Sequence, residues 1–144
     1  MPELERASAL GLFASARVVR LATVRPDGTP HVVPICFALE GDTVYSAVDH
    51  KPKASRALQR LANIAAQPRV SLLADAYSED WSALWWVRAD GIARAVEAGE
   101  SEHDRASGLL RARYEQYEGA PAFGPVIVVR VDLWHGWSSA PRTR

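Results

Sequence analysis

The chain has 144 residues and carries 17 Lys and Arg against 17 Asp and Glu, so its formal net charge is zero. With 48% hydrophobic and 24% charged residues, it has the composition of a folded domain rather than of a disordered chain. The balanced charge argues against a dedicated nucleic-acid binder. The single cysteine, Cys36, excludes an intramolecular disulfide, and no apolar run approaches the roughly 20 residues of a membrane span. We therefore expect one cytoplasmic domain over 1–144, with no signal peptide and no nucleic-acid or membrane partner.

The first half of the chain predicts one helix followed by three strands. A proline and two carboxylates among the first five residues favour a helix start, so we expect a helix over about residues 3–15. Short turns rich in Gly and Asp, typical of an antiparallel meander, separate strands expected over 17–24, 31–39 and 43–48. Pro34 has no backbone N–H, which predicts that the second strand lies at a sheet edge, carries a bulge or faces something other than a strand.

The second half of the chain predicts two helices and three longer strands. Apolar residues at helical spacing predict an amphipathic helix over 54–66 with one stripe formed by Ala54, Ala57, Leu58, Leu61, Ala62 and Ala65. A charged helix is expected over 100–117. Strands are expected over 69–76, 83–96 and 126–134, with a bulge at Gly91. Six strands in strand–turn–strand order exclude a doubly wound nucleotide-binding fold and favour a small antiparallel barrel with peripheral helices.

Positive charge is concentrated after the third expected strand. Between residues 51 and 69 the chain has no acidic residue and five basic ones: Lys51, Lys53, Arg56, Arg60 and Arg69. Helical spacing predicts that Arg56, Arg60 and Asn63 share one face of the helix, opposite the apolar stripe. A helix start flanked by ammonium and guanidinium groups favours phosphate binding, with an ordinary solvated helix face as the alternative.

Five tryptophans are many for a chain of this length. Trp85 and Trp86 are adjacent in an expected strand, so their side chains point to opposite faces of the sheet. Trp85 continues into an apolar core row, whereas Trp86 begins an exposed or interface row with Arg88 and Asp90. Packing of the core and of a dimer explains most of these rings, and Trp81 and Trp86 are the candidates for the wall of a substrate pocket.

The sequence indicates neither a catalytic residue nor a metal site. The four histidines lack metal-ligand spacing, and Cys36 lies in an apolar run, as a small buried residue would. Nucleophile-elbow, dinucleotide-binding and Walker motifs are also missing from the sequence. An enzyme with this sequence therefore needs a cofactor that carries the chemistry.

Three blocks of the chain, taken in order, resemble the split-barrel flavin and deazaflavin oxidoreductases, which are relatives of pyridoxamine 5′-phosphate oxidase. The blocks are RLATVRPDGTPHVVPICFALEGDTVYSAVDHKPK, RLANIAAQPRVSLLAD and WWVRADGIARAV. The resemblance spans about residues 17–137, and DHKPK and the tryptophan-rich strand are most similar to the probable coenzyme F420-dependent subgroup. It implies a mainly β fold, the six-stranded antiparallel split β-barrel of the FMN-binding type, and a homodimer with two cofactor sites between its subunits.

The resemblance also implies which residues bind the cofactor: Val33, Pro34, Ser46, Ala47, Lys51, Lys53, Arg56 and Arg60. The first four would lie against the ring, and the Lys51-x-Lys53 pair would meet the phosphate, with Arg56 or Arg60 as a further donor. The segment between Lys53 and Asn63 is longer than in the common family pattern. The C-terminal residues 134–144 differ from the substrate-binding tail of true pyridoxamine phosphate oxidases, which argues against oxidation of a vitamin B6 phosphate.

These features predict an oxidoreductase in which reduced coenzyme F420 gives a hydride from its ring carbon C5 to a small conjugated acceptor. The first alternative is an FMN-binding flavoprotein of the same fold, because a single phosphate suits the same basic residues. The second is a protein that binds a flavin, haem or another tetrapyrrole without turnover, with His31 or His50 as the axial ligand of a haem. The sequence leaves these three open.

Overall fold

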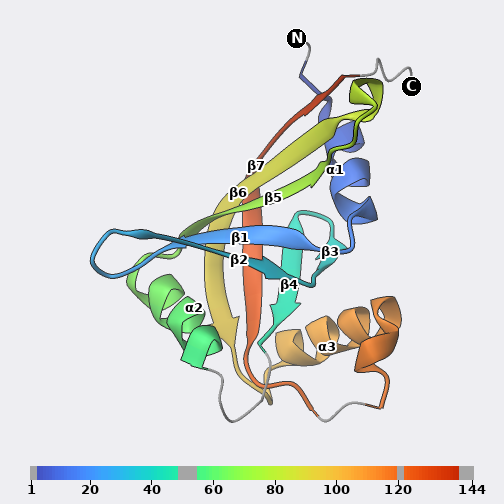
Figure 1. The fold of residues 1–144 in the computed structure, drawn as a ribbon. Helices are drawn as coiled ribbons and strands as arrows, with labels where there is room; N and C mark the ends of the chain where they lie inside the picture. The colour runs from blue at the N-terminus through green and yellow to red at the C-terminus, as the bar shows by residue number, and fades with distance from the viewer. Residues whose placement is uncertain (1–2, 49–54, 120–121, 140–144) are drawn as a thin grey trace.

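In the computed structural model, the described residues are 3–48, 55–119 and 122–139, without the side chains of 55–58, and they form one curled sheet with three α-helices around it (Figure 1). The strands are β1 (Val19–Val24), β2 (Pro30–Ile35), β3 (Ala38–Glu40), β4 (Thr43–Ala47), β5 (Arg69–Ala76), β6 (Trp85–Val96) and β7 (Val126–Ser138). The helices are α1 (Arg6–Ser15), α2 (Ser55–Ala66) and α3 (Ser101–Arg113), with 3-10 turns η1 (Trp81–Ala83) and η2 (Glu115–Tyr117). The expected mainly β, antiparallel class is confirmed.

The strands follow the order β2-β1-β5-β6-β7-β4-β3, and every neighbouring pair is antiparallel. The two edge strands, β2 and β3, are separated by only two residues in the chain, Cys36 and Phe37. The sheet must therefore curl until its edges approach each other, although no backbone ladder joins them. It is a split barrel that is not closed.

The expected count of six strands was wrong, because the strand predicted over 31–39 is divided into β2 and β3. At the division, the backbone N–H of Phe37 donates a hydrogen bond of 3.0 Å to the hydroxyl of Tyr114 instead of to a neighbouring strand. The Phe37 ring is fully buried. A side chain 77 positions away in sequence thus ends one strand and starts the next.

Two residues that interrupt the strand pattern have the expected roles. Pro34 lies in β2, which is an edge strand, so its missing N–H leaves no ladder bond unmade. The pairing of β6 with β7 shifts between Asp90 and Gly91, which confirms the bulge. A Cβ at Gly91 would lie 2.3 Å from the carbonyl oxygen of Arg130, so only glycine fits this close approach.

Several element ends differ from the expected ones because tertiary contacts determine them. The first helix begins at Arg6 rather than at residue 3, because Glu3 forms a β-bridge with Trp137 and Leu4 N–H bonds to the carbonyl of Gly136. The last strand extends past residue 134 to residue 138, where it pairs with the start of β6. The helix expected over 100–117 ends at residue 113.

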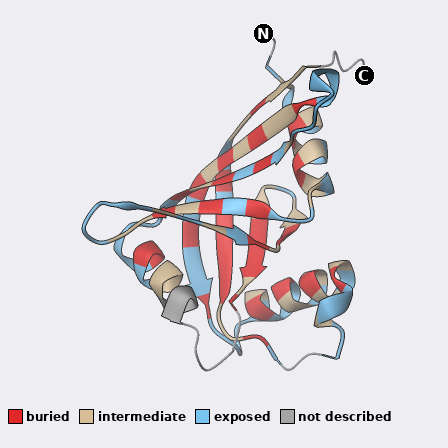
Figure 2. Cartoon of the chain, in the orientation of Figure 1, coloured by how far each residue is buried: buried red, intermediate tan, exposed pale blue. Residues whose placement is uncertain are grey.

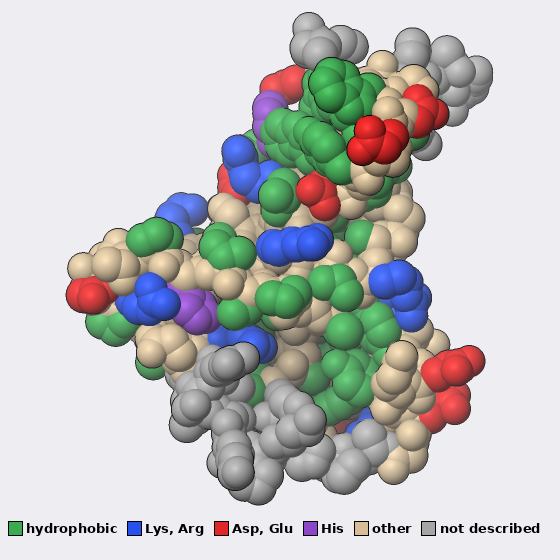
Figure 3. Space-filling view, in the orientation of Figure 1, with side chains coloured by type: hydrophobic (Ala, Val, Ile, Leu, Met, Phe, Trp, Pro, Cys, Tyr) green, Lys and Arg blue, Asp and Glu red, His purple; other side chains and the backbone are tan. Residues whose placement is uncertain are grey.

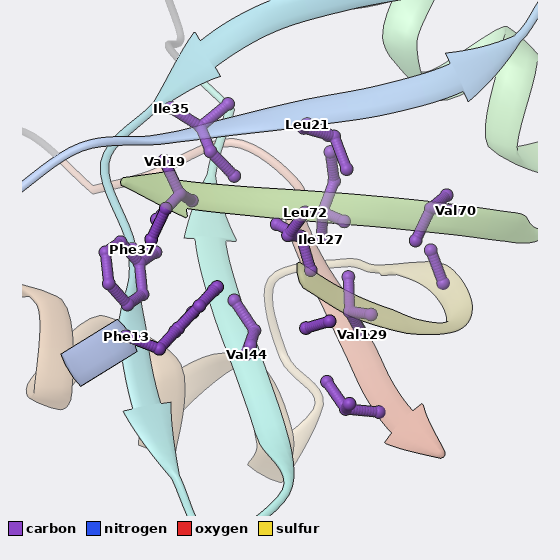
Figure 4. Close-up of a cluster of buried hydrophobic side chains, with 14 of the residues drawn as sticks. Phe13, Val19, Leu21, Ile35, Phe37, Val44, Val70, Leu72, Ile127 and Val129 are labelled. Atoms are coloured by element: carbon purple, nitrogen blue, oxygen red, sulfur yellow. The ribbon is translucent and has the colours of Figure 1, made fainter. Parts of the chain in front are cut away.

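The core lies inside the curl: buried positions alternate with less buried ones along β1, β5 and most of β6, whereas β4 and the start of β7 are buried on both faces (Figure 2). Phe13 of α1 closes it: its ring lies edge-on 5.1 Å from that of Phe37 (Figure 4). The Trp134 ring also lies edge-on to it, at 5.1 Å. Val87 and Ala89 are fully buried, as the row predicted from Trp85 requires. Aromatic edge contacts and apolar burial together stabilise this core.

The helices cover different parts of the sheet. α1 packs on β5, β6 and β7, α2 lies against β1 and β6, and α3 covers β3 and β4 (Figure 1). In the part of the chain that is described, no helix has the length and apolar character to cross a membrane. The arrangement leaves the meeting line of the sheet edges between α2 and α3.

Candidate cofactor site

Two strands that are not neighbours in the sheet are held together where its edges meet. Ser46 of β4 is buried, and its Oγ donates a hydrogen bond of 2.8 Å to the carbonyl oxygen of Cys36, just after β2. Cys36 and Ala47 pack against the same apolar cluster, which includes Tyr114. We call the line formed by Pro34, Cys36, Ser46 and Ala47 the seam. Three of the four positions predicted for the cofactor ring lie on it.

Val33, the fourth predicted ring position, turns the other way. Its side chain is partly buried and packs against the main core, and it is paired with Leu21 of β1. Pro34, by contrast, is exposed. A ligand at the seam would therefore meet Pro34 and the free backbone edge of β2 rather than the Val33 side chain.

The inner face of α2 is polar at its centre. Asn63 is fully buried, its Nδ2 donates to the Thr23 hydroxyl of β1 at 2.9 Å, and its Oδ1 accepts from Gln59 at 2.7 Å. The prediction that Asn63 lies opposite the buried face was wrong, since Ala62 and Ala65 of the predicted apolar stripe are exposed instead. The inward-facing Thr23 hydroxyl needs a partner, and the asparagine amide supplies it.

Beside this bond, two side chains each bury a polar atom that has no hydrogen-bond partner among the described residues. These atoms are the Nε of Arg60, one helical turn before Asn63, and the Nδ1 of His31, which is paired with Thr23 across the hairpin. Burial lowers the pKa of Arg60. Burial, and then the charges of Arg25 and Arg60, lower the pKa of His31 below its usual value. We call Arg25, His31 and Arg60 the basic corner.

In the described part of the chain, no negatively charged group acts on His31. Its pKa shift comes from burial and two guanidinium groups, with no contribution from a carboxylate. Figure 3 shows Lys or Arg and His side chains over the β1–β2 hairpin, with an Asp or Glu side chain at its tip. An anion would be attracted to this corner.

The other predicted phosphate ligands are described only in part. Lys51 and Lys53 lie outside the described residues, and for Arg56 only the backbone, in the first turn of α2, is described. Arg60 is therefore the predicted ligand whose placement is described in full. Sequence reasoning considered His31 only as an axial ligand of a haem. The sequence signal for its placement is the Asp-Gly turn, which sets the β1–β2 register and so puts His31 opposite Thr23, but this signal was not used for His31.

A cavity of about 300 Å³ adjoins the seam at Cys36. It is lined by Arg17, Val18, Cys36, Tyr114, Gln116 and Tyr117. The Tyr114 hydroxyl accepts from Phe37 N–H and lies 2.9 Å from the carbonyl oxygens of Arg17 and Phe37, to one of which it donates. The Arg17 guanidinium lies 4.7 Å above the Tyr114 ring. The cavity thus has fixed aromatic walls and one cationic side, and none of its residues was predicted.

A family model for pyridoxamine 5′-phosphate oxidase matches residues 7–138. The chain belongs to this family. The split-barrel fold expected from the resemblance is therefore shown, with seven strands instead of six and with a sheet that is not closed. No curated protein matches the chain in sequence.

Solved structures with the same fold cover almost the whole chain. An FAD-binding protein from Mesorhizobium loti is 21% identical, with a TM-score of 0.72 over 94% of this chain and 95% of that one. A conserved hypothetical protein from Mycobacterium tuberculosis is also 21% identical, with a TM-score of 0.75 over 98% and 91%. The heme storage protein HutZ from Vibrio cholerae is 16% identical, with a TM-score of 0.70 over 92% and 93%. At these identities the likeness shows the fold alone.

In this member of the family, the two tryptophans predicted for the substrate pocket lie far from α2 in the same chain. Trp81 is 76% exposed in η1, and the Trp86 ring packs at 5.3 Å against the His135 ring. His135 in turn lies 3.0 Å from the Glu3 carboxylate. This end of β6 is near the chain termini, whereas α2 lies at the other side of the β1–β2 hairpin (Figure 1). One chain therefore does not bring these rings to the basic corner.

The outer face of the sheet combines exposed apolar residues with paired polar ones. Large apolar side chains with exposed fractions of 60%, 37% and 51% come from three strands: Val32, Leu73 and Leu133. Between them, the Asp90 carboxylate accepts from Ser71 at 2.7 Å and from Arg88 at 3.0 Å. The predicted row of Trp86, Arg88 and Asp90 lies on this face, half-buried in the single chain.

The residues present fit a cofactor that carries a phosphate group. The basic corner offers a guanidinium with an unpaired Nε, and the seam, which begins at Pro34 three residues along β2 from His31, offers an apolar strand edge for a flat ring. Among the described residues, no group of three His, Cys, Asp or Glu side chains is placed to hold a metal ion. The arrangement suits an organic cofactor with an anionic tail.

Proposed function

We propose that this protein is a cytoplasmic oxidoreductase in which reduced coenzyme F420 gives a hydride to a small conjugated acceptor. The observation that carries the proposal is the half-buried Arg60 with its unpaired Nε, where a cofactor phosphate would complete its hydrogen bonds. FMN is the second candidate, since its single phosphate suits the same corner and a protein of the same fold is described as FAD-binding.

The contacts at the seam give each residue a distinct role. When bound, the cofactor supplies the hydride. Pro34 and Ala47 would form the apolar floor beneath its ring, and Ser46, whose hydroxyl is engaged by Cys36, holds the two sheet edges at a fixed spacing. Arg60 would bind the phosphate together with the cationic residues that the resemblance implies: Lys51, Lys53 and Arg56.

The cavity beside the seam is the proposed acceptor site. Its volume of about 300 Å³ suits a small ring, and the walls formed by Tyr114 and Tyr117 favour a flat conjugated molecule. Arg17 would attract a carbonyl or carboxylate of the acceptor. No carboxylic acid lines the cavity among the described residues, so the proton that completes the reduction would come from solvent. The protein would contribute by placing the two reactants in contact and by excluding water.

We also propose that the protein is a homodimer that pairs through the outer face. Val32, Leu73 and Leu133 are apolar groups that a second copy would cover, and the hydrogen-bonded Asp90 and Arg88 between them need no water to stay paired. In such a dimer, Trp81 and Trp86 of one subunit would reach the partner's cofactor site. This would account for their distance from α2 in a single chain.

The first test is a titration of intrinsic tryptophan fluorescence with coenzyme F420 and, in parallel, with FMN. We expect F420 to bind at micromolar concentration or tighter and FMN to bind more weakly. Arg60→Met should weaken the preferred cofactor about tenfold or more, because a charge-assisted hydrogen bond contributes about 1.5–3 kcal/mol. Arg69→Met is the matched control, because Arg69 is an exposed cation from the same stretch and lies 3.9 Å from Asp132.

The outcomes separate the candidates. Tighter binding of FMN would make this a flavin protein and overturn the F420 assignment. Saturation by haem alone would identify a tetrapyrrole-binding protein without turnover. If F420 binds, loss of the absorbance of its reduced form on addition of enones or quinones should follow at a catalytic rate. Absence of binding by either flavin would refute the oxidoreductase proposal.

A further inference from the structure

His31 stands in an environment that leaves one of its ring nitrogens without a partner. Its Nδ1 is buried and unpaired among the described residues, and so is the Nε of Arg60. β-Pairing places His31 opposite Thr23, and the hydrogen bond from Asn63 to Thr23 fixes α2 over the same point. Arg60 lies one turn before Asn63, so both unpaired atoms belong to the contact between α2 and the hairpin.

An unpaired guanidinium N–H, next to a ring nitrogen that becomes a donor when the ring is protonated, points to a missing acceptor. Buried polar groups are nearly always hydrogen-bonded, and each exception requires an explanation. Both Arg25 and Arg60 act on His31 through their positive charges, and no carboxylate among the described residues contributes to the shift of its pKa. A group that would pair both nitrogens in this field has to be negatively charged and has to offer more than one oxygen.

We propose that His31 is a phosphate-binding residue of this site, which acts together with Arg60 and takes up a proton from solvent when the phosphate binds. The identity of the phosphate as that of the cofactor rests on the proposed function. The binding of an anion and the uptake of the proton rest on the basic corner alone.

The direction of the pH effect follows from the charges around His31. Without a ligand, burial and the two guanidiniums lower its pKa, so the ring is neutral at pH 7. An anion between His31 and Arg60 would raise that pKa, so binding strengthens as the pH falls and levels off once the free ring is protonated. For one proton, the dissociation constant changes by at most about tenfold per pH unit.

None of the described groups around His31 titrates near neutral pH. They come from β1, the hairpin turn and α2: Thr23, Arg25, Asp27, Gln59, Arg60 and Asn63. Hydrogen bonds from Thr29 lower the pKa of Asp27, which keeps it ionised well below the range of interest. The two arginines stay charged throughout.

The test uses sulfate as the probe, because its double negative charge does not change between about pH 5 and pH 8, the range in which histidine titrates. The full-length protein is titrated at several pH values, with histidine ring nitrogens followed by NMR and His31 assigned from the spectrum of His31→Gln. We expect the sulfate dissociation constant to decrease as the pH is lowered. We also expect the pKa of His31 to rise when sulfate is bound. This readout on the unmodified protein does not depend on any variant.

Two variants sharpen the result. His31→Gln should bind sulfate with an affinity that no longer depends on pH, and Arg60→Gln should abolish the sulfate-induced shift of the His31 ring. His135→Gln is the matched control, since His135 pairs with Glu3 at the other end of β6, and it should behave as the unmodified protein does. Sulfate binding that leaves the His31 ring unchanged, or that does not depend on pH, overturns the inference.

The same design separates this inference from the proposed function. If F420 or FMN binds but sulfate does not engage His31, the inference fails and the function stands. If sulfate engages His31 but neither flavin binds, the function fails and the anion site stands. The phosphodiester of F420 and the phosphomonoester of FMN are compared as competitors of sulfate. The one that displaces it from His31 identifies the phosphate that the corner receives.

Discussion

Replacing Asn63 with Ala tests how α2, and with it Arg60, is held against the sheet. The substitution deletes a fully buried amide that donates to Thr23 at 2.9 Å and accepts from Gln59 at 2.7 Å. The lost bond to the partly exposed Gln59 costs about 1 kcal/mol, and the buried Thr23 hydroxyl left without its donor costs about 1–3 kcal/mol. We expect the free energy of unfolding to fall by about 2–4 kcal/mol.

The assay is urea denaturation followed by circular dichroism, with a double-mutant cycle. Thr23→Val removes the hydroxyl that needs a partner. In that background Asn63→Ala should therefore cost only the lost bond to Gln59, about 1 kcal/mol. Gln59→Ala is the single-bond control and should cost about 1 kcal/mol. The reasoning is refuted if Asn63→Ala changes stability by less than about 0.5 kcal/mol, or if its effect adds fully to that of Thr23→Val.

Three further predictions concern the bulge, the outer face and acid stability. Gly91→Ala places a Cβ against the backbone of β7 and should destabilise the protein by about 3 kcal/mol. Gly108→Ala, with open space around it in α3, is the control and should stabilise the protein by about 1 kcal/mol. Equal effects of the two substitutions in urea denaturation would contradict this. Val32→Glu should convert a dimer to a monomer in light scattering, and a persistent dimer would exclude this face as the interface. Hydrogen bonds from an indole and a guanidinium lower the pKa of Asp42 from 3.8, so its contribution to stability is full above that pH and is lost as the pH falls through the lowered value. The difference in melting temperature between pH 7 and pH 3 should therefore shrink in Asp42→Asn but not in Asp132→Asn.

The fold could be predicted from the sequence where local chemistry determines it. Turn residues delimit the strands, Pro34 marks an edge because it lacks an N–H, and Gly91 marks a bulge because a neighbouring carbonyl leaves no room for a Cβ. The division into β2 and β3 could not be read locally, since it depends on a hydrogen bond from Phe37 to the distant Tyr114. Contacts across long sequence separations also determined where the terminal elements begin and end.

The buried face of α2 shows why residue type alone misleads. Helical periodicity counts Asn63 as a surface residue and Ala62 as a core residue, yet the structure has the reverse. The reason is the inward-facing hydroxyl of Thr23, 40 positions earlier, which a polar helix residue must satisfy. The same register brings His31 beside Arg60, a neighbourhood that composition and charge counts do not reveal.

The seam has a consequence for how a ring-bearing ligand enters. Along most of the sheet, widening a gap between strands would break several backbone hydrogen bonds at once, but β2 and β4 are linked at Cys36 by the Ser46 side chain rather than by a ladder. Breaking that bond is a small step compared with unfolding, so β4 can move locally away from the end of β2 and return, while Cys36 and Phe37 still join β2 to β3. Amide protons near the seam should then exchange with solvent faster than those of β6 and β7, and a ligand that bridges the edges should slow them.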